Sequence, residues 1–170
     1  MIVSAGSSET GRIFAARNSD MMFTGINSEI KDIGSEIAGL KKMARGYGRA
    51  IGVFTNCYIV CRPTRKEAQE YHEYYAVEMA DKEAASNLII GRMSRGHLDN
   101  LPPDMVKNLH QRAAGGNGGY PIVGDPDDVT EILLRLHEQG IDAFAMGFTN
   151  YVEHFPFFGE EVLPRLEKAG

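Results

Sequence analysis

The sequence predicts an α/β protein whose strands run parallel to one another. Four short apolar runs, at residues 2–5, 21–24, 51–61 and 143–148, have the length and composition of buried strands. Helical segments separate these runs, and several helices follow the third run. Strands that alternate with helices in this way pair in parallel through right-handed crossovers. The elements fit either a small open α/β sheet or half of an eight-stranded (β/α)8 barrel with a helical insertion.

The first half of the chain supplies two helices between its strands. Gly6, Ser7 and Ser8 form a turn after the first strand, and a short helix follows through Arg12 and Phe14. A longer helix is predicted over residues 26–45, because apolar residues recur there at helical spacing: Ile30, Ile33, Ile37, Leu40 and Ala44.

The predicted insertion lies between the third and fourth strands. Pro63 and Thr64 open a helix whose expected buried residues are Ala68, Tyr71, Tyr75 and Met79. A second helix is predicted over residues 82–93. Pro102 and Pro103 then break the chain before a third helix, which carries Val106, Leu109 and Ala113. A glycine-rich stretch over residues 115–119 follows. It is either a lid over a barrel active site or a plain crossover loop.

The clearest helix signal begins at Asp125. This residue can cap the helix, Pro126 suits its first position, and Asp127 and Asp128 complement the helix dipole. Capping explains these acids better than a metal site does. The apolar stripe is Val129, Ile132, Leu133 and Leu136, and Gly140 ends the helix. The chain closes with one predicted helix through Phe158, Val162 and Leu166.

Composition excludes several classes of protein. The 170 residues are 43% hydrophobic and 24% charged with a net charge of -5, which is typical of a globular domain and not of a nucleic-acid binder. No apolar run reaches the ~18 residues of a membrane span. No basic and apolar leader opens the chain, so a cytoplasmic location is expected.

The two cysteines, Cys57 and Cys61, lie in the third predicted strand. Four residues of strand span roughly 13 Å, which is beyond disulfide reach. We therefore expect buried free thiols. A metal site is not expected, because no second cluster of cysteine or histidine with ligand spacing accompanies them.

Three stretches, in this order and spacing, resemble the luciferase-like superfamily of flavin-dependent monooxygenases. Residues 2–25 read IVSAGSSETGRIFAARNSDMMFTG and resemble the family's fifth barrel strand, its phosphate-side loop and its sixth strand. Residues 53–75 read VFTNCYIVCRPTRKEAQEYHEYY and resemble the seventh strand and its helix. Residues 115–170 begin GGNGGYPIVGDPDD, end LPRLEKAG, and resemble the eighth strand with its flanking helices. The resemblance implies a single domain over residues 1–170, the C-terminal half of a (β/α)8 TIM barrel.

The resemblance also implies a function. Members, which include alkanesulfonate, dimethyl-sulfide and pyrimidine monooxygenases, use reduced FMN and oxygen to oxygenate a small organic substrate. A separate reductase usually supplies the reduced flavin. The N-terminal half of the barrel provides most residues proposed for catalysis, so no catalytic residue is assigned in this chain. The alternative is a non-catalytic half-barrel that binds flavin or phosphate, or that serves assembly.

By this resemblance the flavin phosphate binds at Gly6, Ser7 and Ser8. Ser8 corresponds best to the family's phosphate-contacting serine, Ser7 is the next candidate, and Arg12 could supply positive charge. A glycine that permits close approach, serine hydroxyls and a helix N-terminus suit an anion. On the local sequence alone, an ordinary helix cap is the simpler interpretation.

Three residues near the end of the last strand are candidates for a substrate pocket: Phe148, Asn150 and His154. They lie at or just after the carboxyl end of that strand, where barrel enzymes build their sites. The histidines of the chain form no metal-binding or nucleophile pattern.

The resemblance finally predicts how the chain assembles. The neighbours of the first and last strands belong to the half of the barrel that is missing, so two sheet edges would stand open. Bare edges invite pairing. We expect a homo-oligomer, or a second polypeptide that carries the N-terminal half.

Overall fold

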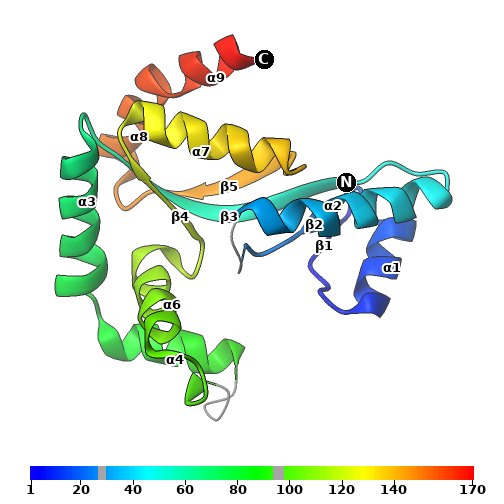
Figure 1. The fold of residues 1–170 in the computed structure, drawn as a ribbon, viewed down its shortest axis with the longest axis horizontal. Coiled ribbons are helices and arrows are strands. Elements are labelled where there is room, and N and C mark those ends of the chain that lie inside the picture. The colour runs from blue at the N-terminus through cyan, green and yellow to red at the C-terminus, as the bar shows by residue number, and fades with distance from the viewer. Residues whose placement is uncertain (27–29, 94–97) are drawn as a thin grey trace. The chain divides into compact units, whose positions relative to one another are not determined.

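The computed structural model describes residues 1–26, 30–93 and 98–170 (Figure 1). The contacts divide the chain into two compact units. Unit 1 comprises residues 1–56 and 131–146, and unit 2 comprises residues 57–130 and 147–170. Strand β3 (Gly52–Cys61) and helix α7 (Pro126–Glu138) each run from one unit into the other.

Unit 1 is a parallel arrangement of strands covered by helices. It contains β1 (Val3–Ser4), α1 (Glu9–Asn18), β2 (Met21–Phe23) and α2 (Ile30–Gly46), together with most of β5 (Ala143–Gly147). β1 pairs with β2 in parallel, with Val3 beside Met21. β2 pairs in parallel with the first residues of β3, and β5 also pairs with β3. The residues of the predicted stripe of α2 are all buried: Ile30, Ile33, Ile37, Leu40 and Ala44.

Unit 2 contains the helical insertion. β4 (Tyr120–Gly124) pairs in parallel with the second half of β3, from Cys57 beside Tyr120 to Cys61 beside Gly124. Helix α3 (Arg65–Glu73) continues into the π-helical turn η1 (Tyr74–Glu78). Helices α4 (Lys82–Arg92) and α6 (Pro103–Gly116) pack against each other (Figure 1). The chain ends with α8 (Tyr151–Glu161) and α9 (Leu163–Ala169).

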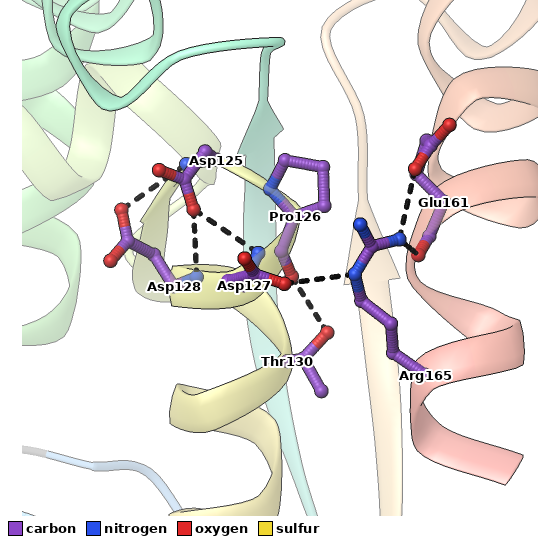
Figure 2. A network of polar contacts seen from close by, with 7 residues as sticks. All are labelled: Asp125, Pro126, Asp127, Asp128, Thr130, Glu161 and Arg165. Atoms are coloured by element: carbon purple, nitrogen blue, oxygen red, sulfur yellow. Dashed lines mark hydrogen bonds and ion pairs between the residues drawn. The ribbon is translucent and has the colours of Figure 1, made fainter. Parts of the chain in front are cut away.

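The predicted cap of α7 is confirmed in detail. Asp125 Oδ1 accepts hydrogen bonds from the N–H groups of Asp127 and Asp128, at 3.1 and 3.0 Å. Arg165 of α9 donates from Nε to Asp127 at 2.9 Å and also contacts Glu161 (Figure 2). Thr130 donates its hydroxyl to Pro126 O at 2.6 Å. The acids therefore build a helix start and tie it to α9.

The predicted α/β class with parallel strands is confirmed, and all four predicted strands are present with slightly shorter bounds. β4 is a fifth strand that the sequence analysis missed. Its Pro121 argues against a strand, because proline lacks an N–H to donate. β4 lies at the end of the strand order β1-β2-β3-β4, where a missing N–H is tolerated.

Several predicted details of the helices are wrong. Met79 is 66% exposed instead of buried, because the π-helical bond from Met79 N–H to Tyr74 O shifts it out of the face of α3. The closing helix is two helices, α8 and α9, that meet at Val162. Of the predicted helix over residues 26–45, the part that the structure describes begins at Ile30. Ile26 is buried but precedes it, and residues 27–29 lie outside the described part of the chain.

The cysteine prediction is confirmed. Cys57 and Cys61 are free and buried, and burial raises the pKa of each thiol to about 12. No helix in the described part of the chain is long and apolar enough to cross a membrane.

The glycine-rich stretch is partly helical instead of a free loop. Gly115 and Gly116 are the last residues of α6, and both lie against the ring of Tyr58. A Cβ atom on Gly116 would stand 2.2 Å from Tyr58 Cδ1. Tyr58 belongs to the buried cluster with Val60 and Ala68, so its ring has little room to move.

Gly116→Ala should therefore destabilise the protein by about 1–3 kcal/mol, the usual cost of overpacking a core. Gly91→Ala is the matched control, because Gly91 also lies in a helix but a Cβ there would meet nothing within 4 Å. That control should stabilise the protein by about 0.5–1 kcal/mol through helix propensity. Urea unfolding followed by circular dichroism measures both. Equal stabilities for the two variants would contradict the packing described.

Candidate functional site

The predicted phosphate-binding turn connects β1 to α1 in unit 1. Ser8 has the extended backbone of an N-cap, and its Oγ accepts a hydrogen bond from Gly11 N–H at 3.1 Å. The backbone N–H of Arg12 donates to Ser8 O at 2.9 Å, which closes the first helical turn. Ser7 and Ser8 are exposed. Because Ser8 Oγ acts as an acceptor for Gly11, its own O–H hydrogen is still available to a ligand.

Two glycines allow this turn to fold back on the helix. A Cβ on Gly6 would stand 2.9 Å from Gly11 Cα, and a Cβ on Gly11 would stand 2.9 Å from Gly6 Cα. Neither position therefore accepts a larger residue without movement of the backbone. The sequence analysis selected Gly6 and missed Gly11. The sequence feature that could have identified Gly11 is its position three residues after the capping serine, Ser8.

Arg12 makes a structural contact in addition to any role in binding. Its Nη2 donates to the backbone oxygen of Glu36 at 2.9 Å, which ties α1 to α2. A guanidinium has five N–H donors, so this single bond leaves charge and donors for an anion.

The three candidates for a substrate pocket lie at the junction of β5 and α8, in unit 2. Phe148 is 9% exposed, and its ring meets the rings of Tyr151, Phe155 and Phe158 at 5.5 Å between centroids. Asn150 caps α8, because its Oδ1 accepts from the N–H groups of Val152 and Glu153. Packing and capping thus account for Phe148 and Asn150.

His154 has a more unusual environment. Arg62, which directly follows β3, lies with Nη2 2.9 Å from His154 Nε2. A guanidinium can only donate, so Nε2 accepts and the ring is neutral with its hydrogen on Nδ1. Partial burial and the Arg62 cation both lower the pKa of His154. The structure thus presents a neutral, half-buried imidazole near the start of α8.

Tyr71 completes this group. Its ring stacks under the guanidinium of Arg62, with Cζ 4.1 Å from the ring centroid, and meets the edge of the His154 ring. Tyr71 also packs on Tyr75, which donates to Gly115 O at 3.2 Å. The sequence analysis missed both Arg62 and Tyr71 as members of a site. The position of Arg62 at the carboxyl end of β3 was the available signal.

A second polar pair joins β3 to α3. Tyr58 OH and His72 Nε2 are 2.9 Å apart. Burial raises the pKa of Tyr58 and lowers that of His72, which favours the neutral form of both groups. This pair holds β3 to α3 and to the glycines of α6.

The rest of the glycine-rich stretch ends α6 and is anchored at several points. Asn117 and Gly118 have positive φ angles of 51° and 77°, as a helix C-terminus requires. Arg112 donates to Gly118 O and Gly119 O, and Arg92 donates to Asn117 Oδ1. These bonds fit the crossover interpretation, because they hold the stretch between α6 and β4.

Among the described residues, no group of three or more His, Cys, Asp or Glu side chains is arranged to hold a metal ion. The geometry instead offers a glycine–serine turn at a helix start in unit 1 and an arginine–histidine–tyrosine group, formed by Arg62, His154 and Tyr71, in unit 2.

Comparison with known proteins places these features in a family context. The family model described as luciferase-like monooxygenase matches residues 2–143. An FMNH2-dependent dimethylsulfone monooxygenase of Pseudomonas fluorescens is 28% identical over 170 residues, which cover 96% of this chain and 45% of that protein. A long-chain alkane monooxygenase of Geobacillus thermodenitrificans is also 28% identical. That alignment covers 100% of this chain and 41% of the relative.

Solved structures agree on the fold. DmoA from Hyphomicrobium sulfonivorans superimposes with a TM-score of 0.83 at 22% identity, over 99% of this chain and 41% of that one. The long-chain alkane monooxygenase LadA gives a TM-score of 0.72 at 24% identity, over 99% and 41% of the two chains. The chain thus spans less than half the length of each of these relatives.

The environment of His154 predicts opposite effects for two neighbours. Arg62→Gln should raise the pKa of His154, because it removes a cation that opposes protonation. Glu153→Gln should lower the same pKa, because Glu153 favours the charged ring. Proton NMR titration of the imidazole resonances measures both. Shifts of the same sign in the two variants would show that the Arg62–His154 contact is not formed.

Proposed function

The chain belongs to the family of luciferase-like monooxygenases, and on that basis we propose that it binds flavin mononucleotide as part of an FMNH2-dependent monooxygenase. The observation that carries the proposal is the β1–α1 turn. There a glycine pair, a capping serine and the start of a ten-residue helix meet. The dimethylsulfone monooxygenases that resemble the chain are FMNH2-dependent by name.

The turn fits a phosphate group. The first N–H groups of a helix have no partner within it, and here Ser8 Oγ occupies only that of Gly11. The N–H groups of Glu9 and Thr10, the Ser8 hydroxyl and the helix dipole are left to favour an anion. The Gly6–Gly11 approach keeps side chains out of the space beside these donors. We assign the FMN phosphate to Gly6, Ser7 and Ser8, with Arg12 as a nearby source of charge.

The bound reduced flavin would supply the oxygen chemistry, while the chain binds and orients it. For the small organic substrate, we propose His154 as the contact among the three pocket candidates. Phe148 and Asn150 are engaged in packing and capping, whereas His154 keeps an N–H on Nδ1. Arg62 fixes that tautomer by donating to Nε2. A separate flavin reductase is the proposed source of reduced FMN.

Ser8→Ala should weaken FMN binding by about 1 kcal/mol, the usual loss for one hydrogen bond. Flavin fluorescence quenching on titration with the chain measures the affinity. Riboflavin, which lacks the phosphate, should bind with equal affinity to the unmodified chain and to the Ser8→Ala variant. Ser35→Ala is the matched control, because Ser35 is an exposed serine on α2. Ser7→Ala tests the second serine.

Two results would overturn the assignment. One is an unchanged FMN affinity in both serine variants. The other is a loss of FMN affinity that is matched by an equal loss of riboflavin affinity. If FMN binds at this turn but no substrate is oxygenated in the presence of a reductase, the non-catalytic half-barrel becomes the better description.

We also propose that the chain works with a second polypeptide, either another copy or one carrying the rest of a barrel. The chain aligns with only 45% and 41% of the length of the dimethylsulfone and long-chain alkane monooxygenases named above. Among the described residues, β1 pairs only with β2, and Ile2 and Val3 are 54% and 48% exposed. An apolar strand edge of this kind tends to pair with another strand.

Multi-angle light scattering at micromolar concentration should therefore give a mass above that of one chain. Val3→Lys, which places a charge on the open edge, should shift the population towards the monomer. A monodisperse, cooperatively melting monomer of the unmodified chain would refute the proposal.

A further inference from the structure

The three side chains of the arginine–histidine–tyrosine group, all in unit 2, contact one another pairwise. Arg62 Nη2 lies 2.9 Å from His154 Nε2. The same guanidinium lies over the ring of Tyr71, with Cζ 4.1 Å from the ring centroid. The rings of Tyr71 and His154 meet at 85°, with their centroids 5.5 Å apart. A change in one of these side chains therefore acts on the other two.

Arg62 depends on Tyr71 to keep its position. Its Nη1 donates to the backbone oxygen of Cys61 at 2.9 Å, which fixes one end of the guanidinium. No carboxylate within the described part of the chain forms a salt bridge with Arg62. A long side chain loses rotamer freedom when it keeps one position, so contacts must hold it there. The Tyr71 ring provides such a contact, because a guanidinium stacks favourably on an aromatic face within about 6 Å of its centroid.

The Tyr71 ring is itself held in place from behind. It packs on the ring of Tyr75, with centroids 5.1 Å apart. Tyr75 is anchored in turn, because its hydroxyl donates to Gly115 O at 3.2 Å. Both tyrosines also pack against the buried cluster that contains Val60 and Ala68. The ring of Tyr71 is thus a fixed surface on which the more flexible Arg62 side chain can rest.

The position of Arg62 decides what His154 can offer to a ligand. A guanidinium only donates, so Nε2 of His154 must accept as long as the contact lasts, and the ring hydrogen lies on Nδ1. A second proton on the ring would set two donors against each other and bring two cations together. Partial burial lowers the pKa of His154, the Arg62 cation lowers it further, and the neighbouring Glu153 opposes both.

The use of the Tyr71 ring differs from ordinary core packing. Any apolar side chain of similar size would fill the space beside Ala68 and Tyr75. Only an aromatic ring has the electron-rich face that attracts a cation, and this is the face over which the Arg62 guanidinium lies. Tyr71 is also only partly buried. Its contact with a charged group at the surface is therefore the feature that requires an aromatic residue here.

We propose that Tyr71 is a positioning residue, whose ring holds the Arg62 guanidinium on His154 Nε2 and thereby keeps the ring hydrogen of His154 on Nδ1. From there the hydrogen can be donated to an acceptor atom of a bound ligand. The value of this arrangement rests on the proposed role of His154 as the substrate contact. The arrangement itself exists without a ligand, and Tyr71 takes no part in any chemical step.

Nitrogen NMR of the imidazole rings in the whole chain tests the proposal, because it distinguishes a ring nitrogen that carries hydrogen from one that does not. At about pH 8, above the ordinary pKa of histidine, His154 of the unmodified chain should carry hydrogen on Nδ1 alone. Tyr71→Leu should release Arg62, move part of that hydrogen to Nε2 and raise the pKa of His154 by about 1, the low end of the effect of a nearby charge. Tyr71→Phe keeps the ring and should change little. Tyr74→Leu is the matched control, because Tyr74 is a neighbouring tyrosine that is 51% exposed, and it should change nothing.

A double-mutant cycle separates the route through Arg62 from the direct contact between the Tyr71 and His154 rings. In an Arg62→Gln background, Tyr71→Leu should change the pKa of His154 far less than it does in the unmodified chain. An equal change in both backgrounds would overturn the proposal, because Tyr71 would then act on His154 by burial alone. An unchanged pKa and an unchanged hydrogen position in Tyr71→Leu would overturn it as well.

A second variant decides the matter if Tyr71→Leu does not fold. Pentafluorophenylalanine at position 71 keeps the shape of phenylalanine but removes the negative face of the ring, so it should act as Tyr71→Leu does and not as Tyr71→Phe does. Identical spectra for the two aromatic variants would contradict the role of the ring face. None of these measurements needs FMN or substrate, so the positioning role stands or falls separately from the proposed monooxygenase function.

Discussion

Strand β3 is the constraint on which the other elements depend. Its first residues pair with β2, Cys57–Cys61 pair with β4, and β5 also pairs with β3. Burial changes along the strand accordingly. It alternates from Gly52 to Asn56 and is continuous from Cys57 to Cys61, where both faces of the strand are covered. A side chain in this second half must fit its neighbours closely. Tyr58 shows the consequence, because its ring leaves room only for glycine at the end of α6 and its hydroxyl engages His72 on α3.

The helix starts show how similar local geometry can have different chemical uses. At α7 the N-terminus is already occupied by carboxylates, since Asp125 takes the free N–H groups and Asp127 meets Arg165. Arg65 binds Asp128 and holds the pKa of that carboxyl below its usual value. An added anion would find these N–H groups already engaged and both arginines already paired with carboxylates. At α1 the cap is a neutral serine beside two glycines, and Glu9 is the single acid of the first turn. This difference in charge, and not the presence of a helix end, supports the proposal that a phosphate binds at the β1–α1 turn.

The group formed by Arg62, His154 and Tyr71 shows how one hydrogen bond decides what a histidine can offer a ligand. Arg62 can only donate, so His154 Nε2 accepts. The neutral ring therefore keeps its hydrogen on Nδ1. At His110, by contrast, Nδ1 donates to Val106 O within α6, so that hydrogen is already engaged. The two rings consequently differ in what they leave for a ligand.

The sequence by itself determined the features that depend on a few adjacent residues. The caps at Ser8 and Asp125, the stripe of α2 and the four apolar strands are of this kind, because hydrogen bonds and periodicity act over one or two turns. Tertiary structure decided the rest. Strand β4 is a strand despite Pro121 because β3 offers it an edge. Gly11 matters because Gly6 approaches it. Arg62 and His154 meet across 92 positions of sequence, and Met79 is exposed because one π-helical bond shifts its register. Contacts between distant residues depend on the packing of whole elements, and no local pattern encodes that packing.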